Sequence, residues 1–161
     1  MSNMILVHMA GLDIGKGNDV LTTLGLGSCV GITLYDPLTK IGGMAHCMLP
    51  GSNNPKEVTN KAKFADTAVI ELMQQVLKLG ARRASLVAKI AGGAHMFSKT
   101  SGTDVIKVGQ RNATVVRGML KEMRVPLLAD ETGGNYGRTI ELYLENGDLK
   151  IKSIGHGQKI V

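Results

Sequence analysis

The sequence predicts an α+β domain in which strands outnumber helices. Short apolar, β-prone runs bounded by turn residues lie towards both ends of the chain, and two longer segments repeat apolar residues at helical spacing. The apolar faces of the sheets then need cover from each other or from the helices. With 161 residues, of which 43% are hydrophobic, the chain is long enough to bury a core, and we expect one domain over residues 1–161.

The first half of the chain is expected to contain four strands and one helix. The strands cover residues 4–9, 20–24, 30–35 and 41–49. A turn over residues 35–40 joins the last two strands into a hairpin. A polar loop then precedes a helix that ends before Gly80, since glycine is common directly after a helix. The apolar face of this helix is predicted from Ala65, Val69, Leu72, Val76 and Leu79.

The second half is expected to contain four strands around a second helix. The strands cover residues 85–90, 127–130, 139–144 and 149–154. The helix is predicted from Asn112, Val116, Met119, Leu120 and Met123, which recur at helical spacing. Pro126 disfavours helix at the residue before it, so the chain leaves this helix as a strand. The last two strands form a hairpin, because Asn146 and Gly147 provide a turn signal between them.

Three glycine-rich bends, at residues 25–31, 92–93 and 133–134, fall at the ends of predicted strands. Loops on a rigid scaffold commonly carry function. The first bend contains Cys29, and His46 follows in the next predicted strand but one. Glycines let the backbone turn sharply near a substrate and leave amide N–H groups free to stabilise an oxyanion. The pattern therefore suggests a cysteine hydrolase with Cys29 as nucleophile and His46 as base.

The same glycines do not form a nucleotide-binding loop. Val30 occupies the third glycine position of a G-x-G-x-x-G motif that would begin at Gly25. Residues 10–17 lack both the first glycine and the final Ser/Thr of a P-loop. Ser28 lacks the flanking glycines of a serine nucleophile elbow. A cysteine nucleophile remains the preferred interpretation.

The formal net charge of +6 favours an acidic partner. Nucleic acid is not expected, because only five residues are aromatic, three Tyr and two Phe, and Arg82-Arg83 is the one adjacent basic pair. No apolar run approaches the length of a membrane span and the N-terminus has no secretory pattern, so we expect a cytoplasmic protein that is not inserted in a membrane. Its two cysteines are then free thiols.

We also expect no metal and no organic cofactor. The four candidate zinc ligands lack the usual short-spaced ligand pairs of zinc sites; they are Cys29, His46, Cys47 and His95. Cys47 follows His46 directly, so in a strand its side chain points to the opposite face and is expected to be structural. His95 and Phe97 are candidates for the lining of a substrate cleft.

Five motifs in the same order resemble a known family. They are TLGLGSCV at residues 23–30, AHCMLP at 45–50, FADTA at 64–68, KIAGGA at 89–94 and DETGGN at 130–135. From about residue 20 to its end the chain is similar to the chemoreceptor glutamine deamidases of the CheD family. The resemblance implies a β-sandwich-like core of mixed or antiparallel sheets flanked by helices, similar to glutamine-deamidating toxin domains.

The resemblance also implies a function and site residues. It identifies Cys29, His46 and Thr23 as catalytic, and it implies conversion of chemoreceptor glutamines to glutamates in chemotaxis adaptation, with a CheC-like phosphatase as a partner in many bacteria. In this chemistry His46 accepts the proton of Cys29, and the thiol pKa is expected to lie below its free value of about 8.5. Backbone N–H groups at Gly27 and Ser28 are expected to hold the oxyanion.

Other interpretations stay open at this level. Cys29 is also compatible with a small buried hydrophobic residue, His46 with a satisfied core histidine and Thr23 with an ordinary strand residue. A non-catalytic binding module would use the same basic surface to hold an acidic chemotaxis partner such as a CheC-like phosphatase. A thiol redox sensor would instead pair Cys29 with Cys47.

Overall fold

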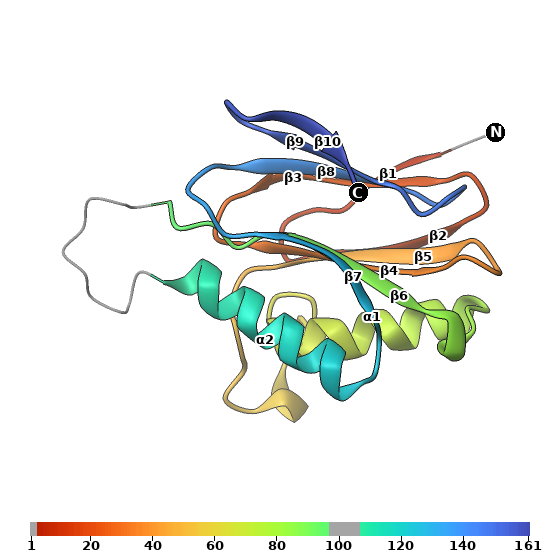
Figure 1. Ribbon diagram of the computed structural model, residues 1–161. Coiled ribbons are helices and arrows are strands. Elements are labelled where there is room, and N and C mark those ends of the chain that lie inside the picture. Colours follow the sequence, from red (N-terminus) through yellow and green to blue (C-terminus); the bar gives the residue numbers. More distant parts are fainter. Residues whose placement is uncertain (1–2, 97–106) are drawn as a thin grey trace.

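A computed structural model of the chain describes residues 3–96 and 107–161, which form three layers (Figure 1). The strands are β1 (Met4–Leu6), β2 (Leu12–Lys16), β3 (Val20–Leu26), β4 (Val30–Asp36), β5 (Ile41–Cys47), β6 (Val87–Gly92), β7 (Leu127–Thr132), β8 (Arg138–Tyr143), β9 (Leu149–Ser153) and β10 (Gly157–Ile160). The helices are α1 (Ala65–Leu79) and α2 (Val108–Glu122), with short 3₁₀ turns at Pro55–Glu57 and Arg83–Ser85. Neither α-helix in the described ranges combines the length and apolar character needed to cross a membrane.

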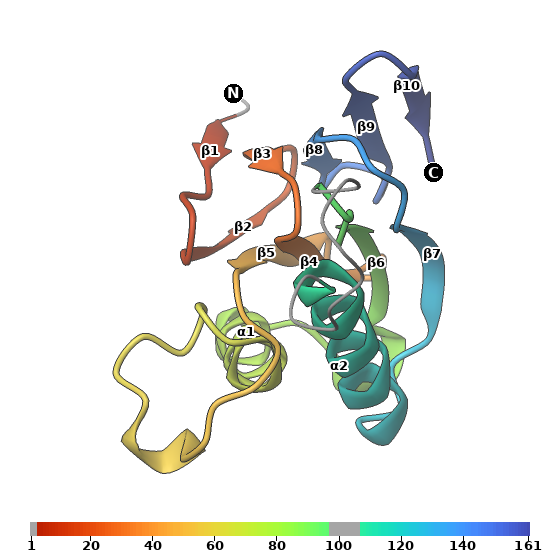
Figure 2. The ribbon, with the colours of Figure 1, turned by 90° about the vertical axis from the view of Figure 1, so that its left-hand side faces the viewer.

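Two five-stranded sheets pack face to face. The outer sheet has the order β1-β3-β8-β9-β10, and the inner sheet has the order β2-β5-β4-β6-β7. Each sheet is mostly antiparallel with one parallel pair, β1 with β3 and β6 with β7. Both helices cover the face of the inner sheet that points away from the outer sheet (Figures 1 and 2). The expected α+β fold, with a sheet core and flanking helices, is confirmed.

The inner sheet lies between two hydrophobic cores. One core joins it to the helices and contains Val30, Cys47 and Val116, and the other joins it to the outer sheet and contains Leu26, Met44 and Ile140 among its members. Strands β4 and β5 are buried along their whole length because both of their faces are covered. A strand buried on both faces needs no polar face, which explains why these two strands are largely apolar without a regular apolar–polar alternation.

Most predicted elements are present, and the differences lie at sheet edges and element ends. The hairpins β4–β5 and β8–β9 are confirmed, as is α1 with Gly80 at its end in a left-handed conformation (φ 125°). Strands β2 and β10 were not predicted. Both are short edge strands with exposed polar residues, and each contains a glycine, which is uncommon within strands. Helix α2 begins at Val108, one turn before Asn112, which is the first residue of the predicted helix face.

Gly31 allows the two sheets to approach closely beside the site. A Cβ atom at this position would lie 2.6 Å from Cδ1 of Ile140 in β8 and 3.0 Å from Cδ1 of Leu26 in β3. Any larger residue would push the outer sheet away from β4. The missing side chain therefore sets the distance between the sheets where the candidate residues meet.

Candidate active site

Cys29 directly precedes β4, and His46 lies in the neighbouring strand β5, on the same face of the inner sheet. The β4–β5 ladder pairs Val30 with Cys47 and Gly31 with His46. Val30 and Cys47 belong to the core under the helices, whereas Cys29 packs against the core between the sheets. Because side chains alternate along a strand, Cys29 and His46 both point towards the outer sheet.

Thr23 reaches the same place from the outer sheet. Its Oγ1 atom lies 2.7 Å from Nδ1 of His46, and both side chains are buried, with 0% and 1% of their surface exposed. The pairing of β3 with β8 shifts register directly after Thr23, between this residue and Leu26. Such an irregularity bends a strand and changes the direction of nearby side chains. The structure thus brings Thr23 and His46 into contact across the two sheets.

The hydrogen bonds of Thr23 determine which nitrogen of His46 carries the proton. The Thr23 hydroxyl donates its single proton to the carbonyl oxygen of Val7, 2.7 Å away. It can then only accept from His46, so Nδ1 of the imidazole carries hydrogen and donates it. The Nε2 atom is left with a free lone pair. This atom is buried and has no hydrogen-bond partner among the described residues.

Burial shifts the pKa values of Cys29 and His46 in opposite directions, in each case towards the neutral form. Burial raises the pKa of the Cys29 thiol, although its own backbone N–H opposes the shift. Burial lowers the pKa of His46. The expectation of a thiol pKa below the free value is therefore wrong for this structure, because the loss of hydration penalises the thiolate and the imidazolium alike. Burial thus favours the neutral thiol and the neutral imidazole over a preformed ion pair.

The three glycine-rich bends meet around Cys29. The N–H of Gly93 donates to the Cys29 carbonyl at 2.8 Å, and the N–H of Ala94 donates to the Gly27 carbonyl at 2.8 Å. The third bend joins them through the N–H of Gly133, which donates to the Gly92 carbonyl at 3.0 Å. These bonds hold the backbone on both sides of the thiol. The oxyanion role of the N–H groups of Gly27 and Ser28 stays a prediction.

Cys47 lies on the opposite face from His46, as the alternation of the strand predicts. Its side chain is fully buried under the helices, and burial raises its pKa to about 12. Both cysteines are free thiols. Cys47 therefore has a packing environment, whereas Cys29 is partly accessible.

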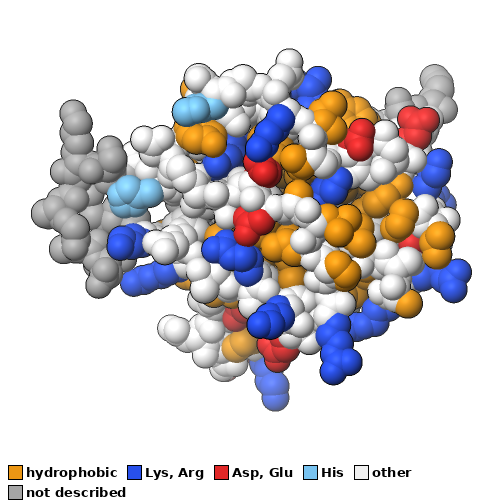
Figure 3. Space-filling view, viewed as in Figure 1, with side chains coloured by type: hydrophobic (Ala, Val, Ile, Leu, Met, Phe, Trp, Pro, Cys, Tyr) orange, Lys and Arg blue, Asp and Glu red, His pale blue; other side chains and the backbone are white. Residues whose placement is uncertain are grey.

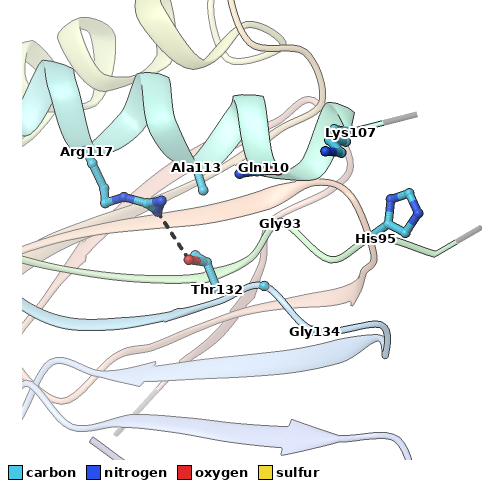
Figure 4. Close-up of a pocket in the computed structure, with 9 residues that line it drawn as sticks. Gly93, His95, Lys107, Gln110, Ala113, Arg117, Thr132 and Gly134 are labelled. Atoms are coloured by element: carbon cyan, nitrogen blue, oxygen red, sulfur yellow. Dashed lines mark hydrogen bonds between the residues drawn. The ribbon is translucent and has the colours of Figure 1, made fainter. Parts of the chain in front are cut away.

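His95 lines a separate pocket of about 340 Å³ between α2 and the second and third glycine bends (Figure 4). The pocket is lined by Gly93, His95, Lys107, Gln110, Ala113, Arg117, Thr132, Gly133 and Gly134, and thus not by Cys29, His46 or Thr23. The Nδ1 atom of His95 is buried with no partner in the described parts of the chain. Phe97 lies outside the described residues.

Sequence reasoning missed two buried polar residues beside the site. Asn112 was interpreted as part of an apolar helix face, yet its Nδ2 atom donates to the carbonyls of Ser28 and Met48. Arg138 is 4% exposed and donates to the Gly92 carbonyl at 3.2 Å. An amide within an otherwise apolar helix stripe is the signal that could have identified Asn112.

Comparison with known proteins shows the family of this chain. A family model described as CheD chemotactic sensory transduction matches residues 48–153. The chain belongs to the CheD family. Proteins named "Probable chemoreceptor glutamine deamidase CheD" are 54% identical over 159 residues in Lachnoclostridium phytofermentans and 48% identical over 160 residues in Caldanaerobacter subterraneus, each comparison covering 99% of both chains. The relative in Moorella thermoacetica is 54% identical over 88% of this chain and 85% of its own.

These CheD relatives support the family assignment more strongly than the short motifs do, because they match along almost the whole chain. The family model begins after Cys29 and His46, but the full-length relatives span the whole site region. The family assignment and the Thr23–His46 contact are independent observations. Both are compatible with a hydrolase that uses a cysteine nucleophile.

Proposed function

We propose that the protein is a protein-glutamine deamidase that acts on chemoreceptors in chemotaxis adaptation. The observation that carries the proposal is the state of His46, whose Nδ1 is held by Thr23 while its buried Nε2 has no partner in the described residues. A histidine in this state is oriented to accept a proton. Cys29 on the same face supplies that proton and the nucleophile. The names of the relatives supply the substrate class.

In the proposed reaction, Sγ of Cys29 attacks the side-chain carbonyl carbon of a glutamine while its proton passes to Nε2 of His46. The imidazolium then gives this proton to the departing nitrogen. The C–N bond breaks, ammonia leaves, and a thioester joins the substrate to Cys29. Water next attacks the thioester carbon with His46 again as base, the C–S bond breaks, and the thiol and a glutamate are formed.

The proposal is tested on the full chain and a purified cytoplasmic fragment of a chemoreceptor from the same organism. Mass spectrometry reports the conversion of each glutamine to glutamate. Wild type and Cys47→Ala are expected to convert the same glutamines, whereas folded Cys29→Ala converts none, because no other group forms the thioester. Equal conversion by Cys29→Ala would contradict the cysteine mechanism, and no conversion by wild type would contradict the function.

The same proposal includes a cytoplasmic site of action, where thiols stay reduced, and a CheC-like phosphatase as partner. The net charge of +6 supports an acidic partner. On the face shown in Figure 3, Lys and Arg side chains are spread out with acidic side chains among them. The alternative of a binding module without chemistry predicts complex formation with no conversion, so the same measurement distinguishes the two.

A further inference from the structure

We infer that Asn112 is a positioning residue that sets the separation between the Cys29 and His46 strands at the reacting end of the site. Asn112 lies in the second turn of α2 and is 0% exposed. Its Nδ2 atom lies 2.9 Å from the carbonyl oxygen of Ser28 and 3.0 Å from that of Met48. Ser28 directly precedes Cys29, and Met48 is two residues after His46. The inference rests on the proposed function of this pair.

The backbone ladder between β4 and β5 includes His46, which pairs with Gly31, and ends just before Cys29. Its last pair joins Val30 to Cys47. Beyond this pair the second strand turns away, because the N–H groups of Met48 and Leu49 donate to the Lys63 carbonyl at 2.8 and 3.1 Å. The segment before β4 that contains Cys29 turns towards the second glycine bend, where it accepts hydrogen bonds from the N–H groups of Gly93 and Ala94. Where the ladder stops and the two segments diverge, the side chain of Asn112 on α2 joins them through its hydrogen bonds to Ser28 and Met48.

The chemistry of the amide suits this role. An amide NH₂ group has two protons, and here each carbonyl receives one of them. The remaining Oδ1 atom is buried without a partner in the described residues, which is a cost that an apolar residue would avoid. The two donated bonds are therefore what distinguishes Asn112 from its apolar neighbours on the helix face. An aspartate of the same shape would place a carboxylate against two carbonyl oxygens.

Helix α2 is held in place by contacts that do not depend on Asn112. Val116, one turn later on the same face, is fully buried in the core under the inner sheet, and so is Leu120. At the start of the helix, a Cβ atom on Gly109 would overlap the Ala94 carbonyl oxygen, so glycine allows close contact with the second bend. Substitution of Asn112 is thus expected to leave the helix docked.

The test compares Asn112→Ala and Asn112→Asp with Val116→Ala, which removes buried apolar contacts from the same helix face but no hydrogen bond to Ser28 or Met48. We expect kcat for deamidation to fall roughly ten- to hundredfold in both Asn112 variants with little change in KM, because small displacements of reacting groups are costly. Folded Val116→Ala keeps wild-type kcat. Wild-type kcat in a folded Asn112 variant, or an equal loss in Val116→Ala, would overturn the inference.

A second measurement does not need the deamidase substrate. The rate of Cys29 alkylation by iodoacetamide at neutral pH depends on His46 as base, so Asn112→Ala should slow it in wild type but not in a His46→Ala background. Equal slowing in both backgrounds would mean that Asn112 acts on the thiol independently of His46, and would overturn the inference. If Asn112→Ala slows alkylation only when His46 is present, but wild type deamidates no receptor glutamine, the inference stands and the proposed function is rejected.

Discussion

Oγ1 of Thr23 lies 2.7 Å from Nδ1 of His46, and the same hydroxyl donates to the Val7 carbonyl at 2.7 Å. Thr23 is therefore an acceptor for the imidazole and not a donor to it. This direction leaves Nε2 of His46 as the ring nitrogen with a free lone pair, and it has no hydrogen-bond partner among the described residues. The outer sheet thus controls the tautomer of a histidine that the inner sheet carries.

Thr23→Val should impair the enzyme through the histidine. The substitution keeps the shape of the side chain but leaves the Nδ1–H of His46 buried without an acceptor, so deamidation should slow roughly tenfold or more. The lost bonds should also lower the free energy of unfolding by about 1–3 kcal/mol. Thr23→Ser keeps the hydroxyl and serves as the control. Equal kcat values for the valine and serine variants would argue against this role.

The pH dependence should reveal a neutral pair. Burial lowers the pKa of His46, so activity should fall only as pH decreases through a value below about 6.5, where the imidazole gains a proton and can no longer accept one. Burial raises the pKa of Cys29, so its alkylation should titrate above the free-cysteine value of about 8.5. Mass spectrometry of the alkylated protein measures this midpoint separately for Cys29 and Cys47. A Cys29 midpoint below the free value would indicate an ion pair.

The same shifts link folding to pH. The unfolded chain protonates His46 below about pH 6.5, whereas the folded chain does so only at its lowered pKa. The contribution of His46 therefore makes the folded state less stable as pH falls through this window, and that loss stops below the folded pKa. Chemical unfolding at several pH values, with His46→Ala as the control, measures this contribution.

Gly92→Ala should disturb Cys29 directly. Gly92 has a φ of +105°, and a Cβ atom there would overlap the Cys29 carbonyl oxygen. Gly133 has a similar φ of +97°, but its Cβ would meet no described atom within 4 Å. Both alanine variants should lose roughly 1 kcal/mol of stability from backbone strain, whereas only Gly92→Ala should lose most of its deamidase rate. Similar rates in the two variants would show that the clash does not reach the thiol.

The elements that sequence patterns predicted well are those with strong local signals. The β4–β5 hairpin follows from its turn residues, and α1 follows from its apolar spacing and Gly80. Strand β2 was missed because its pairing partner β5 lies about thirty residues away and its own residues include glycine, aspartate and lysine. Asn112 was interpreted as a core position, because periodicity reports burial and not the hydrogen bonds made there.

The sequence alone was sufficient to place Cys29 in the bend before one strand of a hairpin and His46 in the other strand, and the alternation of side chains put Cys47 on the face away from His46. These relationships lie within one hairpin, where local geometry decides them. The contact of Thr23 with His46 depends on how two separate sheets pack, and the pKa directions of Cys29 and His46 depend on the burial that this packing creates. Only the tertiary structure decided them, because hydration and contacts between sheets depend on the whole fold and not on spacing along the chain.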